Sequence, residues 1–228
     1  MTIIEIPTPP GMGRSLIDHD PRNRDYPTRG VLHAVDAPLV EKTWRRGHAY
    51  DQGRTSQCVA FTGKGMLNTA PTSAAAPYRT RAAYSTDDFY AGAQAADEWP
   101  GQSPDYEGTS AKGLCAYLTT QGLITEYRWC FGVDDVLRTV SHHGSVGCGT
   151  WWSRSMFTPG ERGLLTVDGE WIGGHEWEIV GVDPHREEVI ACNSWSLSWG
   201  DRGHFRLTFA DLDRLLTADG DAFTLVPA

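Results

Sequence analysis

A cysteine and a glutamine near residue 55 have the types and spacing needed for acyl transfer. Cys58 stands at the predicted start of a helix, after a loop that contains Gln52. A helix N-terminus carries about half a positive charge, which favours a thiolate over a thiol. The Gln52 amide and the Cys58 backbone N–H could both donate to an oxygen that becomes negative during the reaction. The segment therefore predicts a nucleophile beside an oxyanion site.

Two later segments supply a base and a residue that orients it. His175 follows two glycines at the start of a predicted strand, where a neutral imidazole could take the thiol proton and return it to a leaving group. Asn193, at the end of another strand, could hold that histidine in the useful tautomer, with Trp195 shielding the bond from water. Each segment alone is ordinary, because a lone cysteine is more often a small buried hydrophobe.

Together the three segments resemble the motifs of papain-like cysteine peptidases. QGRTSQCVAF resembles that family's QGxCGSCWAF, GHEWEIVGVD resembles GHAVxxVGY, and NSWSLSWGDRGHFRL resembles NSWGxxWGxxGYFRI. The histidine and asparagine follow the cysteine at close to the ~130–150 residues typical of these enzymes. The resemblance covers roughly residues 47–226. It implies these roles: nucleophile for Cys58, acid/base for His175, orienting residue for Asn193, oxyanion donor for Gln52, and supporting indoles for Trp195 and Trp199.

The resemblance also implies a substrate-binding set, with departures from the family pattern. These positions are Gly108, Gly174 and Glu176. The family's usual Gly-Gly pair is reduced here to Gly108 followed by Thr109, and Glu176 replaces a small residue near the expected second subsite. A carboxylate there favours a basic substrate side chain through charge complementarity.

The order of elements predicts an α+β protein. Periodicity and capping residues predict helices over 58–68, 85–98, 109–121, 133–143 and 210–217. Strands are predicted over 146–151, 163–167, 177–182, 189–193, 204–208 and 222–226. The resemblance implies a papain-like two-lobed fold with the active-site cleft between the lobes. We expect an extended surface arm over 1–49, a helical left lobe over 50–130 and a β-rich right lobe over 131–228.

Composition limits the possible functions. The 228 residues are 40% hydrophobic with a net charge of -9, which disfavours disorder and binding to a phosphate backbone. No apolar run approaches the ~20 residues of a membrane span. The five cysteines form no CxxC pair, and the N-terminus does not read as a secretory signal, so a cytoplasmic location is expected. Association with a virus particle and release on lysis remain open.

The sequence predicts no cofactor and no metal. His142, His143 and Cys148 lack a fourth ligand at metal-site spacing. The expected partner is a peptide or protein substrate, with no nucleic acid and no membrane, and the sequence does not indicate an oligomeric state. The leading hypothesis is a peptidase that acts through a thioester. The alternatives are a peptidoglycan-cleaving amidase or endopeptidase, and a non-catalytic binding or structural protein, such as one of a virus particle, that keeps the fold.

Overall fold

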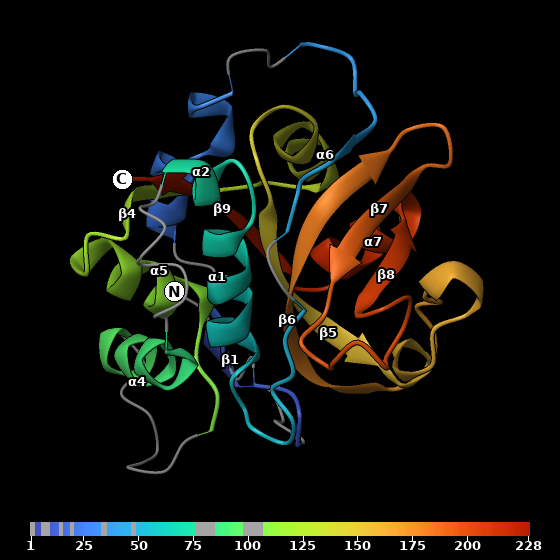
Figure 1. Cartoon of the computed structure of the whole chain (residues 1–228), viewed down its shortest axis with the longest axis horizontal. Coiled ribbons are helices and arrows are strands. Elements are labelled where there is room, and N and C mark those ends of the chain that lie inside the picture. The colour runs from blue at the N-terminus through green and yellow to red at the C-terminus, as the bar shows by residue number, and fades with distance from the viewer. Residues whose placement is uncertain are drawn as a thin grey trace.

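The computed structural model describes residues 3–5, 10–13, 16–18, 21–32, 36–46, 49–75, 85–97 and 107–228. The helices that precede residue 121 gather on one side of the molecule, and most strands of an antiparallel sheet lie on the other side together with the two later helices (Figure 1). The predicted α+β class, with a helical lobe and a β-rich lobe, is confirmed.

Helices form close to where the sequence predicts them. The α-helices are α1 (Cys58–Asn68), α2 (Thr72–Ala75), α4 (Thr86–Ala96), α5 (Ala111–Thr120), α6 (Val133–His142) and α7 (Phe209–Thr217). Ser85 and Ser110 cap α4 and α5, because each side-chain oxygen accepts a hydrogen bond from a backbone N–H of the first turn. Short 3₁₀ helices are η1 (Pro21–Asp25), η2 (Thr28–Gly30), η3 (Arg154–Phe157) and η4 (Glu161–Gly163).

Most strands belong to one sheet. The strands are β1 (Ile3–Glu5), β2 (Leu16–Asp18), β3 (Lys42–Thr43), β4 (Ile124–Trp129), β5 (Val146–Ser153), β6 (Trp171–Asp183), β7 (Glu188–Cys192), β8 (His204–Thr208) and β9 (Asp221–Pro227). The sheet has the order β4-β9-β5-β6-β7-β8, and β3 pairs with β6. β1 and β2 pair with each other.

Two strand predictions need correction, and one strand was missed. The strand predicted over 163–167 is wrong: Arg162 and Gly163 adopt positive φ angles in η4, and the following chain makes only a bridge from Leu164 to Arg206 of β8. β4 was not predicted, because its polar residues obscure the alternation of an edge strand. β6 begins at Trp171, so His175 lies within the strand instead of opening it.

Two glycines let α1 pack closely on both of its neighbours. A Cβ at Gly63 would lie 2.7 Å from Leu114 of α5, and a Cβ at Gly65 would lie 2.7 Å from Glu178 of β6. The glycines lower helix propensity by about 1 kcal/mol each relative to alanine. Because they have no side chain, they allow the helix that begins at Cys58 to pack against the strand that carries His175.

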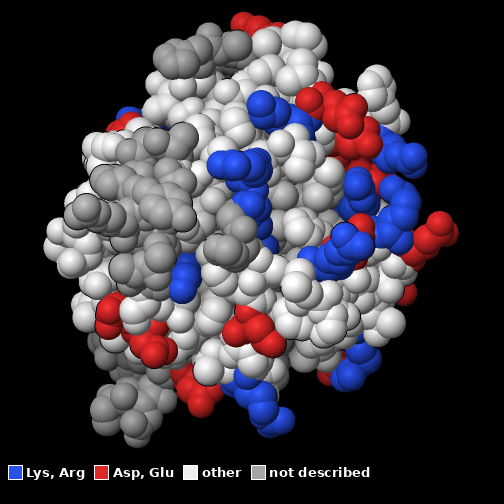
Figure 2. Space-filling model, in the orientation of Figure 1, with Lys and Arg blue, Asp and Glu red and all other residues white. Residues whose placement is uncertain are grey.

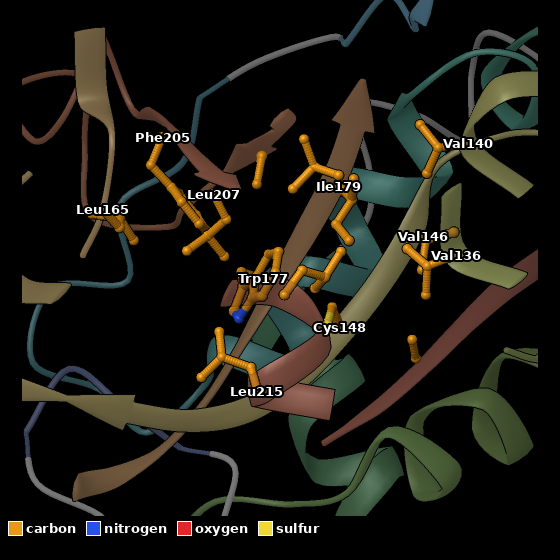
Figure 3. Close-up of a cluster of buried hydrophobic side chains, with 14 of the residues drawn as sticks. Val136, Val140, Val146, Cys148, Leu165, Trp177, Ile179, Phe205, Leu207 and Leu215 are labelled. Atoms are coloured by element: carbon orange, nitrogen blue, oxygen red, sulfur yellow. The ribbon is translucent and has the colours of Figure 1, made fainter. Parts of the chain in front are cut away.

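Each lobe has its own hydrophobic cluster. One lies among β5–β8, α6 and α7 and includes Trp177, Ile179 and Leu215, as Figure 3 shows. The other joins α1, α4 and α5 to residues of β4 and β9. The two clusters meet across the α1–β6 contact, so burial fixes the relative position of the elements that carry the candidate catalytic residues.

The predicted N-terminal arm contains several elements instead of one extended run. β1, β2, η1, η2 and β3 all lie before residue 50. Met12 is fully buried, so part of this segment is inserted into the molecule and not laid on its surface. β4, which precedes residue 131, pairs with β9, which follows it. The division into an arm and two lobes at these boundaries stays a prediction.

The face in Figure 2 carries intermixed charges. Ion pairs form among the residues of the sheet lobe: Arg162 and Arg206 both pair with Glu188, and Arg186 pairs with Asp183. Interspersed charges of opposite sign weaken the long-range field that polyanions need. Separately, none of the helices in the described segments has the length and apolar character needed to cross a membrane.

Candidate active site

Cys58 is the first residue of α1 and is fully buried. The first turn of α1 contains no acidic residue, so no carboxylate opposes the positive end of the helix. The Gln57 side chain does not cap the helix; it donates to Asp87 of α4 instead. This position favours the thiolate form of Cys58.

Gln52 ties the loop before Cys58 to the segment after β7. Its backbone N–H donates to the Ser194 carbonyl at 2.8 Å, and its side-chain oxygen accepts from the Ser194 hydroxyl at 2.6 Å. Its amide nitrogen donates to the Thr55 carbonyl at 2.8 Å. That bond uses one of the two amide hydrogens, so the side chain is held in place with a second donor left over.

His175 and Asn193 make the hydrogen bond that the sequence predicts. His175 Nε2 lies 2.7 Å from Asn193 Oδ1, and both side chains are buried. The same oxygen accepts the Ser194 backbone N–H at 2.7 Å, which identifies it as the carbonyl end of the amide. Nε2 must therefore carry the proton, and Nδ1 keeps its lone pair. Among the described residues, Nδ1 has no hydrogen-bond partner.

Gly203 fixes the backbone of Asn193. Its carbonyl accepts the Asn193 N–H at 2.9 Å, and its φ of 80° lies in the left-handed region that favours glycine. The chain thus returns on itself after β7 and presents Asn193 to His175.

Aromatic rings enclose the imidazole. Trp195 stacks on His175 with ring centroids 4.7 Å apart, and Trp152 meets it edge-on at 4.9 Å. The Phe157 ring stacks on the Trp195 ring, with ring centroids 5.4 Å apart. Trp199 contacts Trp195 at 5.2 Å and donates to the Phe157 carbonyl. These rings exclude water from the His175–Asn193 bond.

Burial lowers the pKa of His175 from 6.5 to about 4, because the charged imidazolium is desolvated; the hydrogen bond to Asn193 acts in the opposite direction. Above pH 4 the ring is therefore neutral unless a negative charge forms next to it. A neutral ring with a free Nδ1 lone pair can accept a proton.

This shift predicts a pH-dependent stability in Cys58→Ala, where no thiolate can pair with His175. The unfolded chain binds a proton near pH 6.5 and the folded chain only near pH 4. Stability is thus fully present above pH 6.5 and falls as the pH drops toward 4, by about 3 kcal/mol. Denaturant unfolding at pH 7 and pH 4 should show this loss in Cys58→Ala relative to Cys58→Ala/His175→Gln. Equal losses in the two variants would contradict the assignment.

Gly108 has both backbone groups engaged. With a φ of 92°, it donates its N–H to the Tyr90 hydroxyl at 2.6 Å and accepts from Gln94 Nε2 at 3.0 Å. Thr109 next to it donates its N–H to the Gly13 carbonyl at 3.0 Å. The backbone groups that the sequence assigns to an extended substrate therefore already have partners within the chain.

Glu176 is buried in the middle of the sheet. It lies opposite Gly149 of β5, which in turn lies opposite Asp221 of β9. Residues that pair in direct register have their side chains on the same face of the sheet. Glu176 and Asp221 therefore lie on either side of Gly149, which has no side chain. Burial raises the pKa of Cys115 on α5 well above its usual value, and the charges of Glu176 and Asp221 raise it further. Gly174 is also within β6, opposite Trp151.

The remaining cysteines differ from Cys58 in setting. All five are buried, and none of them forms a disulfide. Burial raises the pKa of Cys130 to about 12 and that of Cys192 to about 12. The residues considered for a metal do not gather: His142 contacts the Pro38 carbonyl, whereas Cys148 lies in the hydrophobic core. The described part of the chain has no group of three His, Cys, Asp or Glu residues suited to a metal ion.

Several site residues were not found from the sequence. Trp152 approaches His175 because it lies opposite Gly173, whose missing side chain leaves room for an indole. The two glycines before His175 were a signal of such close approach. Ser194 and Phe157 gave no signal, since their contacts with Gln52 and Trp195 depend on segments far apart in the sequence.

Comparison with known proteins finds matches among solved structures only. The chain matches no protein-family model, and it matches none of the curated proteins. Among solved structures, xylellain, a cysteine protease from Xylella fastidiosa, aligns over 100% of both chains with a TM-score of 0.72 and 16% identity. Digestive procathepsin L 3 of Tenebrio molitor aligns over 86% of this chain and 72% of its own, with a TM-score of 0.62 and 14% identity. The proform of the ragweed cysteine protease Amb a 11 aligns over 89% and 70%, with a TM-score of 0.59 and 15% identity.

Proposed function

We propose that this chain, whose fold is that of the papain-like cysteine proteases, is a cysteine peptidase that cleaves amide bonds through a thioester. The observation that carries the proposal is the buried His175–Asn193 hydrogen bond of 2.7 Å, covered by Trp195. This bond fixes the tautomer that leaves the Nδ1 lone pair available to accept a proton. His175 lies on β6, the strand against which α1 packs, and α1 begins at Cys58. A purely structural buried histidine is expected to have both ring nitrogens hydrogen-bonded, whereas Nδ1 of His175 has no such partner among the described residues.

In the acylation step, His175 Nδ1 takes the proton of Cys58, and the thiolate attacks the substrate carbonyl carbon. The carbonyl oxygen becomes negative and accepts hydrogen bonds from the free Gln52 amide hydrogen and the Cys58 backbone N–H. His175 then gives its proton to the amide nitrogen, the C–N bond breaks and the amine leaves. The imidazolium and thiolate stabilise each other as a pair, which offsets the desolvation of each.

In the deacylation step, water attacks the thioester carbonyl. His175 Nδ1 accepts a proton from that water, and the same donors hold the oxyanion. The C–S bond breaks, the carboxylic acid leaves, and the proton returns to the sulfur. Asn193 keeps the imidazole oriented through both steps, because its oxygen accepts from Nε2 whether the ring is neutral or charged.

The proposal is tested by hydrolysis of two substrates. We expect the chain to cleave an unfolded protein such as reduced casein, and Cys58→Ala to abolish cleavage. Cys115→Ala is the matched control, since Cys115 is equally buried in α5 and its high pKa keeps it a thiol. Cleavage of purified sacculi without cleavage of casein would favour the cell-wall alternative. Failure on both substrates would favour a non-catalytic protein.

Glu176 supports a preference for a basic side chain in the substrate. Together with Asp221 it places two carboxylates on one face of the sheet across Gly149, near α5. Oppositely charged groups across an interface set specificity more than affinity. A substrate arginine or lysine directed at this face would complement the two acids.

We therefore expect Glu176→Gln to lower kcat/KM for an arginine-containing peptide about tenfold relative to its leucine analogue, a change of about 1.4 kcal/mol. A peptide library measures the preference, and Glu170→Gln is the control because Glu170 is exposed and pairs with Arg154. An unchanged arginine-to-leucine ratio in Glu176→Gln would refute the specificity assignment.

A further inference from the structure

A pocket of about 380 Å³ lies beside β8, the last strand in the order of the sheet. Most of the charged residues that line it are basic, and Asp201 is the one acid among them. The basic residues are Arg162 of η4, Arg202 of the turn before β8, and His204 and Arg206 of β8. None of the candidate catalytic residues lines this pocket, so it is a feature separate from the candidate active site.

Glu188 holds two of these arginines in place. Its carboxylate accepts from Arg162 Nη2 at 3.0 Å and from Arg206 Nη1 at 3.3 Å, and its side chain is only 8% exposed. A guanidinium group has five N–H donors, and no other acceptor among the described residues binds either group. Most donors of both arginines therefore remain for a ligand, while the buried carboxylate fixes the position of both side chains.

A tight turn carries the third arginine. Asp201 and His204 exchange backbone hydrogen bonds of 2.8 and 3.1 Å, and Arg202 and Gly203 between them have φ angles of 54° and 80°. This is the pattern of a type I′ turn, in which asparagine or glycine usually stands at the position of Arg202. The Gly203 carbonyl also accepts the Asn193 N–H, which attaches the turn to the chain after β7. The Arg202 side chain forms no ion pair with the described residues.

The pocket has an excess of positive charge. Arg162 and Arg206 share one carboxylate and so keep one unbalanced positive charge. Arg202 adds a second charge, and Asp201 offsets only one of the two. The whole chain, in contrast, has a net charge of -9. A local positive site in an acidic protein attracts a small anion, whereas the surrounding acids repel a long polyanion.

The pocket also has an apolar wall. Ile190 of β7 is half-buried, lines the pocket and pairs in register with Arg206 of β8. Residues paired in this way have their side chains on the same face of the sheet. Pockets of roughly 300–1,000 Å³ typically bind small organic molecules. Both the volume and the mixed lining therefore fit a ligand that joins an anionic group to an organic one.

We propose that this pocket binds a small organic phosphate monoester. The three arginines come from η4, from the turn and from β8, and a phosphate group offers three terminal oxygens to donors from different directions. A carboxylate offers only two oxygens in one plane. The phosphate binds the guanidinium groups, and the organic group contacts Ile190. The assignment uses no part of the peptidase chemistry.

Two variants test the site. Arg202→Gln removes a cation whose side chain pairs with no described residue, so no buried group loses its partner. Arg162→Gln removes a second cation, and Glu188 keeps Arg206 as its partner. Arg154→Gln is the matched control, because it removes the same charge from an exposed residue of the same lobe that does not line the pocket.

Calorimetric titration with phenyl phosphate measures the affinity. We expect saturable binding to the wild type, at least about tenfold weaker binding to Arg202→Gln and Arg162→Gln, and unchanged binding to Arg154→Gln, since each pocket variant loses hydrogen bonds between charged groups. Benzoate has the same ring with a carboxylate of one charge. It should bind the wild type at least about tenfold more weakly than phenyl phosphate.

No saturable binding of phenyl phosphate, or equal affinities in wild type and Arg202→Gln, would overturn the proposal. Equal binding of benzoate and phenyl phosphate would overturn the assignment of a phosphate. Binding of heparin without binding of phenyl phosphate would show a surface attraction for polyanions and overturn the pocket as well. All of these results leave the reactivity of Cys58 untouched, so the failure of this site and the failure of the peptidase proposal are distinguishable.

Discussion

Replacing His175 by glutamine is expected to lower peptide hydrolysis by about 10²–10⁴-fold, the contribution typical of a positioned general acid–base group. In the proposed mechanism, the variant loses the group that moves the proton between the sulfur and the leaving nitrogen. It should also slow alkylation of Cys58 by iodoacetamide at pH 6, because an ordinary thiol with a pKa near 8.5 is almost wholly protonated there.

The control for this variant is His142→Gln. His142 is the last residue of α6, is half-buried and hydrogen-bonds the Pro38 carbonyl, so its replacement should change neither rate. The rate of hydrolysis of a chromogenic peptide measures the first effect. The rate of Cys58 alkylation, from reactions quenched at set times, measures the second. Full alkylation rates in His175→Gln would show that the histidine does not activate the cysteine.

Gln52→Ala is expected to reduce kcat by about 10²–10³-fold, the cost of removing one oxyanion donor. Alkylation by iodoacetamide displaces iodide at a saturated carbon and forms no oxyanion. Its rate in Gln52→Ala should therefore stay close to that of wild type. This contrast separates an electrostatic role in the transition state from a role in shaping the loop.

Gln57→Ala serves as the matched control for Gln52→Ala. Gln57 belongs to the same loop, but its amide donates to Asp87 of α4 and not toward Ser194. We expect near wild-type kcat in this variant. If Gln52→Ala slows alkylation as much as hydrolysis, the glutamine supports the loop through Ser194 and Thr55 and does not stabilise the oxyanion.

Local patterns in the sequence located the elements that carry the site. The helix predicted from Cys58 to Asn68 and the strand predicted from His204 to Thr208 have the observed bounds. The serines Ser85 and Ser110 mark the starts of α4 and α5 in the same local way, because a cap acts within a few residues that a sequence displays directly. The predicted contact of His175 with Asn193 is likewise present, because Asn193 directly follows β7, the strand that pairs with the His175 strand β6.

Contacts between distant segments could not be predicted in this way. No periodic pattern in residues 10–13 predicts that Gly13 packs on Ser56 or that Met12 belongs to the hydrophobic cluster of the sheet lobe. The burial of Glu178 is similar, since a charged residue in a strand normally indicates the solvent face. Here Arg46 Nε pairs with the Glu178 carboxylate at 3.2 Å and compensates the buried charge.

The most direct test of the central claim is the order in which the five cysteines react with iodoacetamide at pH 6. Peptide mapping by mass spectrometry reads that order in the folded protein. We predict that Cys58 is modified first and that Cys115, Cys130 and Cys192 follow only on unfolding, because burial raises the pKa of each of these three thiols. Earlier modification of any other cysteine would show that Cys58 is a structural residue and contradict the assignment of this site as a peptidase centre.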